Sequence, residues 1–256
     1  MTTVPLTLLT EPCANCGRDV QREIRPGLLA ELARKLAPIC DECAAAAEQE
    51  DRERHEREAD QARAERVRDR IARSGLPAKY HDLTLDGLDH DPAVIAAALS
   101  WVVDGGGLLL TGPVGVGKTM VAGVAARARL ERAAVVWLTA PLLFARLGSG
   151  FDSPQRDEAL EVLSGRSTLV LDDIDKARPT EYGAEQIFVA VDQRVEHRAA
   201  LLVTSNLKPS QLAERWPSPY SEAITSRLVG YCEVVAVGGV DRRLRAGQHS
   251  TERGEN

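Results

Sequence analysis

Short apolar runs alternate with amphipathic segments through the middle of the chain. Four runs rich in Val and Leu have the length of buried strands: 107–111, 134–139, 168–172 and 200–205. Four segments with apolar residues at helical spacing lie among them: 118–131, 141–147, 155–163 and 181–195. Continuous apolar strands that alternate with helices are typical of a parallel sheet covered on both faces. The pattern therefore predicts an α/β fold for this part of the chain.

A phosphate-binding loop follows the first apolar run. Residues 112–119 read Gly-Pro-Val-Gly-Val-Gly-Lys-Thr, which is the G-x-x-x-x-G-K-T motif. The glycines let the backbone bend so that its N–H groups point at phosphates, and the following helix adds its positive N-terminal partial charge. Lys118 is predicted to reach the β- and γ-phosphates, and Thr119 to ligate Mg²⁺. The residues predicted to bind ATP here are Gly112, Pro113, Val114, Gly115, Val116, Gly117, Lys118 and Thr119.

Two later apolar runs end in polar side chains. The third run ends in Asp172-Asp173, and the fourth is followed by Asn206. A carboxylate at such a strand end can hold Mg²⁺, and the next acid can orient or deprotonate the attacking water. We therefore predict Asp172 as a magnesium ligand and Asp173 and Asn206 as catalytic residues. A surface turn for the acids and a helix cap for Asn206 are the alternatives. Asp175 is a third acid nearby, with no assigned role.

Arginines near the C-terminus are the last candidates in this domain. Arg227 lies on a predicted short amphipathic helix, and Asp241-Arg242-Arg243 follows a strand predicted at residues 233–237. A single arginine on a helix is usually a solvated surface residue. In a ring or spiral, however, it can be supplied to a neighbour's ATP, where it stabilises the charge on the transferring phosphate.

Four cysteines near the N-terminus form two C-x-x-C pairs, Cys13 with Cys16 and Cys40 with Cys43. This spacing is that of a Cys₄ zinc site. The alternatives are two disulfides, which a reducing compartment disfavours, and a redox motif, which two copies without a βαβ pattern disfavour. Leucines at helical spacing predict a helix over residues 27–37. A module this small would take its folding free energy from the metal.

A charged segment follows the cysteine pairs. Residues 48–73 consist almost entirely of Ala, Gln and charged residues without an apolar stripe, which predicts a solvated helix or a semi-rigid spacer. A coiled-coil partner helix or a nucleic-acid arm is the alternative. Four parts are therefore predicted: a zinc-binding partner-interaction domain (1–47), a charged helical linker (48–75), an ATPase domain (76–245) and a disordered tail (246–256).

Composition narrows the class of protein. Aromatic residues make up only 4% of the chain, so the core must be built from Ala, Leu and Val. A net charge of −6 argues against a general electrostatic grip on nucleic acid but permits a local basic stripe. No segment reaches the roughly 18 apolar residues that span a bilayer, and the N-terminus lacks a signal-peptide pattern. These features predict a cytoplasmic protein with no membrane partner.

The ordered set of motifs in residues 76–245 resembles the AAA+ superfamily, specifically the DnaC-type replicative helicase loaders and their IstB-like relatives. Thr204-Ser205-Asn206 resembles sensor 1, and Ser226-Arg227-Leu228 resembles the box that carries the arginine finger. Asp241-Arg242-Arg243 resembles sensor 2, with Arg243 as first choice. The resemblance thus implies Arg227 and Arg243 as catalytic residues. General AAA+ ATPases have Glu at the position of Asp173, and this departure predicts slow hydrolysis.

The resemblance implies a helicase loader that needs ATP, Mg²⁺ and Zn²⁺. It would bind a replicative helicase hexamer through the Cys₄ module, which resembles the helicase-binding domain of Bacillus-type loaders. It would bind single-stranded DNA through an ATPase ring or spiral, and residues 141–166, including Phe144 and Arg146, correspond to a DNA-binding helical insertion of the loaders. An IstB-like transposition helper, acting on duplex DNA with a transposase, is the alternative. A small-molecule kinase would need an acceptor pocket and lid arginines that the motifs do not suggest.

Overall fold

The computed structural model describes residues 7–24, 36–150 and 152–242. The chain divides into two compact units, Met1–Glu65 and Arg66–Asn256. Most of the helix predicted over residues 27–37 lies outside the described residues, as do Arg243 and the tail predicted at 246–256.

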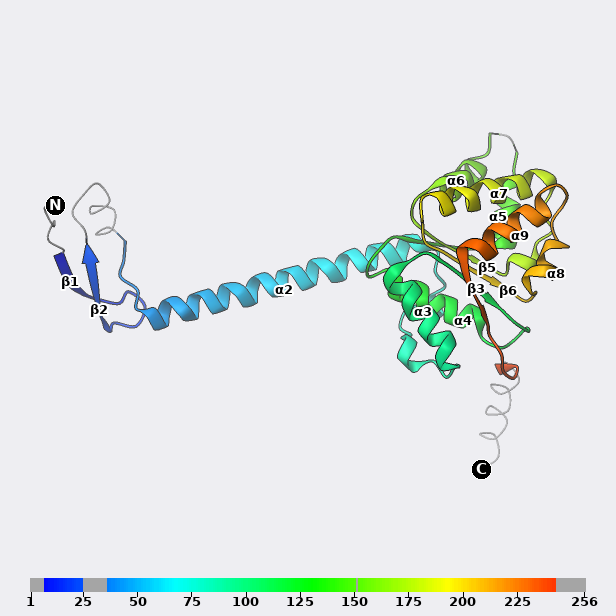
Figure 1. The fold of residues 1–256 in the computed structure, drawn as a ribbon. Coiled ribbons are helices and arrows are strands. Elements are labelled where there is room, and N and C mark those ends of the chain that lie inside the picture. Colours follow the sequence, from blue (N-terminus) through cyan, green and yellow to red (C-terminus); the bar gives the residue numbers. More distant parts are fainter. Residues whose placement is uncertain (1–6, 25–35, 151, 243–256) are drawn as a thin grey trace, which may run out of the picture. The chain divides into compact units, whose positions relative to one another are not determined.

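The first unit contains an antiparallel hairpin of β1 (Thr7–Pro12) and β2 (Asp19–Ile24), shown in blue in Figure 1. The turn between the strands carries the first cysteine pair and Gly17, whose φ of 76° suits glycine. The second pair stands at the start of helix α2 (Asp41–Ser74). This helix includes residues 48–74 of the segment predicted as a charged linker (48–75) and carries the i,i+4 ion pair Arg57–Glu53 at 3.8 Å.

The second unit is built on a five-stranded parallel sheet with the order β4-β5-β6-β3-β7. Its strands are β3 (Gly107–Thr111), β4 (Val135–Thr139), β5 (Thr168–Asp172), β6 (Leu201–Ser205) and β7 (Cys232–Ala236). The predicted α/β class is confirmed, and each predicted strand matches within one residue. Because all five strands are parallel, their carboxyl ends meet at one edge of the sheet.

Helices cover both faces of the sheet (Figure 1). Leu108 and Leu110 of β3 pack with α3 and α4, whereas Leu109 packs with α5, α6, α7 and α9 on the other face, as the alternation of a strand requires. The helices are α3 (Pro92–Asp104), α4 (Lys118–Arg129), α5 (Ala140–Leu147), α6 (Pro154–Ser164), α7 (Glu181–Glu196), α8 (Pro209–Ala213) and α9 (Tyr220–Tyr231), with short 3₁₀ turns η1 (Ala78–Tyr80), η2 (Leu85–Gly87) and η3 (Ile174–Lys176).

A buried arginine ties together the loops at the amino ends of two strands. The guanidinium of Arg194, in α7, donates to the carbonyls of Val162, Gly165, Ser167 and Ala200 at 2.8 to 3.4 Å. Burial lowers the pKa of Arg194 to about 10. Four carbonyls therefore take the place of a carboxylate partner for Arg194. These hydrogen bonds hold the segments that lead into β5 and β6.

Among the described residues, no helix combines the length and the apolar character that crossing a membrane requires.

Candidate nucleotide-binding site

The phosphate loop connects β3 to α4 through three glycines with positive φ. The φ angles are 148° at Gly112, 84° at Gly115 and 100° at Gly117. A Cβ at Gly112 would lie 2.1 Å from the carbonyl oxygen of Val237, so only glycine fits at this position. The loop can therefore adopt turns that aim backbone N–H groups at an anion. Val116, in contrast, is buried in the core and anchors the loop.

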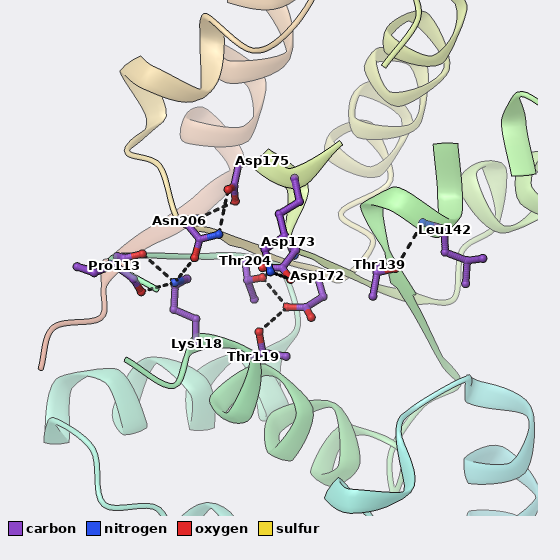
Figure 2. Close-up of polar contacts among 12 residues, drawn as sticks. Pro113, Lys118, Thr119, Thr139, Leu142, Asp172, Asp173, Asp175, Thr204 and Asn206 are labelled. Atoms are coloured by element: carbon purple, nitrogen blue, oxygen red, sulfur yellow. Dashed lines mark hydrogen bonds and ion pairs between the residues drawn. The ribbon is translucent and has the colours of Figure 1, made fainter. Parts of the chain in front are cut away.

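Lys118 lies at the first turn of α4 and is 5% exposed. Its Nζ donates to the carbonyls of Gly112 and Pro113 at 2.7 Å each and to Oδ1 of Asn206 at 2.8 Å (Figure 2). Burial lowers the pKa of Lys118, while the carboxylates of Asp173 and Asp175 act in the opposite direction. The lysine and asparagine predicted from the sequence thus meet at the same edge of the sheet.

Asp172, at the end of β5, is 4% exposed and accepts two hydroxyl hydrogen bonds on one oxygen. Thr119 Oγ1 donates to its Oδ1 at 3.0 Å, and Thr204 Oγ1 donates to the same atom at 2.6 Å (Figure 2). Burial raises the pKa of Asp172, and the hydrogen bond from Thr204 partly offsets this effect. A hydroxyl and a carboxylate side by side are the hard oxygen ligands that Mg²⁺ prefers, so these residues fit the ion.

Asp173 differs from its neighbour in both backbone and environment. It adopts left-handed backbone angles, with φ 57°, which an Asp accepts more readily than most residues. Its N–H donates to Thr204 Oγ1 at 2.8 Å, and its carboxylate pairs with Lys176 Nζ at 2.5 Å. Thr204 therefore links both acids, a role that the sequence reasoning missed because a Thr within an apolar strand gives no signal of its own.

Asp175, for which no role is predicted from the sequence, orients Asn206. The backbone N–H of Asn206 donates to Asp175 Oδ1 at 2.7 Å, and its side-chain Nδ2 donates to Oδ2 at 2.9 Å (Figure 2). Burial alone would raise the pKa of Asp175, but these hydrogen bonds outweigh burial and hold the pKa below its usual value. The amide oxygen of Asn206 is thereby directed at Lys118. The clue in the sequence was a third acid three residues after Asp172.

Arg227 and the sensor 2 segment take different positions. Arg227, on α9, donates from Nε to Asp192 Oδ1 at 2.5 Å, and its guanidinium carbon lies 4.5 Å from the centre of the Phe188 ring. Both partners belong to α7, so the described contacts of Arg227 leave it outside the phosphate loop of its own chain. Arg242 lies against the loop, because its N–H donates to the Gly115 carbonyl at 3.0 Å.

His90 also lies beside the phosphate loop. A Cβ at Gly117 would be 2.5 Å from its Nε2, and this buried nitrogen has no hydrogen-bond partner among the described residues. Burial lowers the pKa of His90, and nearby Arg242 adds to the effect.

The two residues named for the predicted DNA-binding insertion make contacts within the second unit. Phe144 packs edge-on against Trp216, and Arg146 pairs with Glu158 at 3.4 Å.

The four cysteines of the first unit converge. Their sulfur atoms lie within 4.8 Å of one another, and the Cys16 and Cys40 sulfurs are 3.6 Å apart. Zn–S bonds of about 2.3 Å in a tetrahedron require sulfurs about 3.8 Å apart, so the group can hold a metal. Backbone N–H donors, first that of Cys40, lower the pKa of Cys13 to about 6, which favours the thiolate that metals bind.

The fold and the site define an ATP-binding protein of the AAA+ class. The phosphate loop follows β3, the fourth strand in the order of the sheet. The ends of the neighbouring strands β5 and β6 bring Asp172 and Asn206 to this loop. The chain belongs to the family of IstB-like ATP binding proteins, whose sequence model matches residues 44–250.

Curated relatives come from insertion sequences. An ATP-binding protein in an insertion sequence of Mycobacterium tuberculosis is 27% identical over 151 residues, which cover 58% of this chain and 60% of that protein. The ATP-binding protein of insertion sequence IS1162 from Pseudomonas fluorescens is 31% identical over 159 residues, covering 57% and 68%. An IS21-like ATP-binding protein of Bacteroides fragilis is 29% identical over 188 residues, covering 69% of each chain.

Solved structures share the fold. DnaI superimposes with a TM-score of 0.57 at 20% identity, covering 64% of this chain and 96% of that chain. The DnaC helicase loader gives 0.54 at 21% identity, covering 63% and 100%. At these identities the similarity establishes the AAA+ fold alone.

Proposed function

We propose that this protein hydrolyses ATP slowly and uses the bound nucleotide as a switch for assembly on DNA. The observation that carries this proposal is the convergence of Lys118, Thr119, Asp172 and Asn206 at one edge of the sheet. Lys118 and Thr119 come from the first turn of α4, whereas Asp172 and Asn206 come from the ends of β5 and β6, which lie far from that turn in the sequence. Lysine and asparagine suit the phosphates, and threonine and aspartate suit Mg²⁺.

The residues divide the work of hydrolysis. Lys118 exchanges its carbonyl contacts for β- and γ-phosphate oxygens, and Asn206 holds the attacking water. Asp173 takes a proton from that water as the water oxygen bonds to the γ-phosphorus and the bond to the β–γ bridging oxygen breaks. Thr119 and Asp172 would hold Mg²⁺, which neutralises charge on the phosphates. Because Asp173 is short and paired with Lys176, the proton transfer is slow.

ATP turnover of two lysine variants tests this proposal. Lys118→Ala should abolish turnover, since the buried ammonium at the phosphate loop is lost. Lys208→Ala, an exposed lysine at the N-terminal end of α8, is the matched control and should hydrolyse ATP at the wild-type rate. Equal turnover in the wild type and Lys118→Ala would contradict the proposed site.

For the biological role we propose helicase loading, with the Cys₄ module as the part that binds the helicase. The four cysteines precede residue 44, where the family match begins, so the module is an addition to the shared ATPase. A pull-down with the helicase hexamer of the same organism tests this role. Cys16→Ala should lose the helicase, whereas Cys232→Ala, a buried cysteine of β7 outside the module, should retain it. Wild-type protein that fails to bind the helicase would contradict the role.

A transposition helper is the second candidate, and the three relatives from insertion sequences favour it. In this role the protein would organise duplex DNA for a transposase. Electron microscopy with ATP separates the candidates: regular assemblies on duplex DNA favour the helper, whereas complexes with a helicase hexamer and single-stranded DNA favour the loader.

A further inference from the structure

The sheet edge opposite the phosphate loop carries a basic hollow. Its volume is about 340 Å³, and it lies at the amino ends of β5 and β6 beside the C-terminal end of α4. It is lined by Arg129, Arg166, Ser167, Thr168, His197 and Arg198 together with four alanines. No acidic residue is among these described lining residues, although the whole chain has a net charge of −6. We call these lining residues the basic hollow.

The arginines of the hollow have no carboxylate partner in the described part of the chain. The side chains of Arg166 and Arg198 are exposed and form no hydrogen bond or ion pair with another described residue. Arg129 donates from one terminal nitrogen to the carbonyls that end α3, while its buried Nε has no partner among the described residues. Because like charges close together repel, this arrangement favours an anion between them.

The surrounding charges strengthen this conclusion. Arg132 lies near Arg129 and adds to the positive potential. Asp104 also acts on Arg129, and it accepts a hydrogen bond from Ser100 at 3.3 Å. Glu131 is engaged by Arg127 at 3.5 Å. The nearby acids thus lie outside the lining of the hollow, and the exposed side chains of Arg166 and Arg198 remain available to a ligand.

We propose that the basic hollow binds the phosphodiester backbone of DNA. The planar guanidinium matches phosphate oxygens in a bidentate geometry, and hydroxyl groups such as that of Ser167 add neutral donors. Among the described lining residues the imidazole of His197 is the single aromatic ring, and no Phe, Tyr or Trp offers bases a broad stacking surface, so the contact is made mainly to phosphates and is largely independent of sequence. This inference rests on the proposed function, since it supplies the DNA contact that the function needs.

The salt dependence of DNA binding tests the proposal. The double variant Arg166→Gln with Arg198→Asn removes two charges, and Asn suits the φ of 50° at residue 198. Fluorescence anisotropy with single-stranded and duplex oligonucleotides, in the presence of ATP, should show an affinity about 10-fold lower at 0.1 M salt. The slope of log K against log salt should become shallower by about 1 to 2. The reason is that binding releases about one counterion fewer for each phosphate contact that the variant has lost. The two oligonucleotides show which form of DNA the hollow prefers.

Controls separate this inference from the proposed function. ATP turnover without DNA should be unchanged, because the hollow lies at the edge of the sheet opposite the phosphate loop. The matched variant Arg73→Gln with Arg215→Gln removes two exposed arginines elsewhere in the second unit and should leave the slope unchanged. The variant Arg166→Lys with Arg198→Lys keeps both charges and should retain the wild-type slope, even if the neutral variant is unstable.

Two results would overturn the inference. Wild-type affinity and slope in the neutral variant would overturn it and leave the proposed function intact, with an acidic protein segment as the ligand of the hollow. Wild-type protein that hydrolyses ATP but binds neither form of DNA would overturn both the inference and the action on DNA.

Discussion

Two neighbouring carboxylates at the end of β5 have different environments, and the difference supports the different roles proposed for them. Asp172 is buried and accepts hydrogen bonds from Thr119 and Thr204, so its position is fixed. Asp173 is turned away by its left-handed backbone and pairs with the more exposed Lys176. A fixed oxygen suits a metal, whereas a carboxylate that can leave its partner suits proton transfer.

Asp172→Asn should increase the stability of the folded protein and strongly reduce ATP turnover. Burial raises the pKa of Asp172, so its ionised form is costly in the folded protein, whereas Asn keeps an oxygen that accepts from both threonines. Mg²⁺ loses a charged ligand, and we expect ATP turnover to fall by at least about 100-fold. Calorimetry should give a higher Tm for the variant at pH 7.

The pH dependence of that Tm difference is the internal control. As pH falls toward 3.8, the ordinary pKa of the group, wild-type Asp172 takes up its proton and the cost of burying a charge disappears. The stability gain of the variant should therefore be largest above the raised pKa and vanish in acid. A wild-type protein more stable than the variant at pH 7 would contradict this account.

Asp175→Asn should lower kcat more than it changes KM. The side chain of Asp175 accepts from both the backbone and the side chain of Asn206, and an amide has one acceptor oxygen instead of two. Asn206 can then flip, so that its NH₂ group meets the ammonium of Lys118. Because Asn206 is proposed to hold the water, we expect kcat to fall about 10-fold to 100-fold, as measured by steady-state kinetics. A purely structural role would change the Tm and leave kcat intact.

The candidate site was predictable from the sequence where a motif or a strand end marks it. The phosphate loop, Asp172 and Asn206 each follow an apolar run, and parallel strands bring their carboxyl ends together. Asp175 and Thr204 were not predictable, because their importance arises from side-chain contacts across two strands. Spacing along the chain shows which edge of the sheet a residue reaches, but it does not show which atoms meet there.

The same reasoning explains which elements were predicted. Strands β3 and β5 are short, nearly continuous apolar runs, and such runs between helical segments are typical of buried parallel strands. Helix α3 was missed, although Asp91 caps it by accepting from the Ala93 N–H and Gly105 ends it with φ 77°. Its apolar residues are spread too widely for a clear amphipathic stripe. The β1–β2 hairpin was missed because β2, apart from Ile24, is largely exposed and its sequence mostly polar.

Removal of metal should unfold the hairpin of the first unit. Among the described residues of that unit, only Cys13, Ile24 and Cys43 are buried, which is too little apolar surface to fold without a cross-link. A chelator should therefore abolish hydrogen-exchange protection of the amides of β1 and β2, and zinc should restore it. ATP turnover of the second unit should persist, which serves as the control. Protection that survives the chelator would show that the cysteines hold no structural metal.

At the scale of the whole molecule, we propose that Arg227 connects the nucleotide site to assembly. Asp192 and Phe188 of α7 hold its guanidinium from two sides, so the side chain is positioned before any partner arrives. Its described contacts do not include the phosphate loop of its own chain. A head-to-tail arrangement of subunits would bring such a residue to the site of a neighbour, and each site would then need two chains.

Mixing two inactive variants tests this arrangement. Lys118→Ala lacks a working site but keeps Arg227, whereas Arg227→Ala keeps the site and lacks the arginine. Each variant alone should be inactive, and an equal mixture should recover about a quarter of the wild-type turnover, because one of the four possible interfaces joins an intact site to an intact arginine. Lys118→Ala mixed with the double variant Lys118→Ala/Arg227→Ala has no such interface and should stay inactive. An inactive mixture whose mass shows normal assembly would mean that Arg227 does not act across subunits.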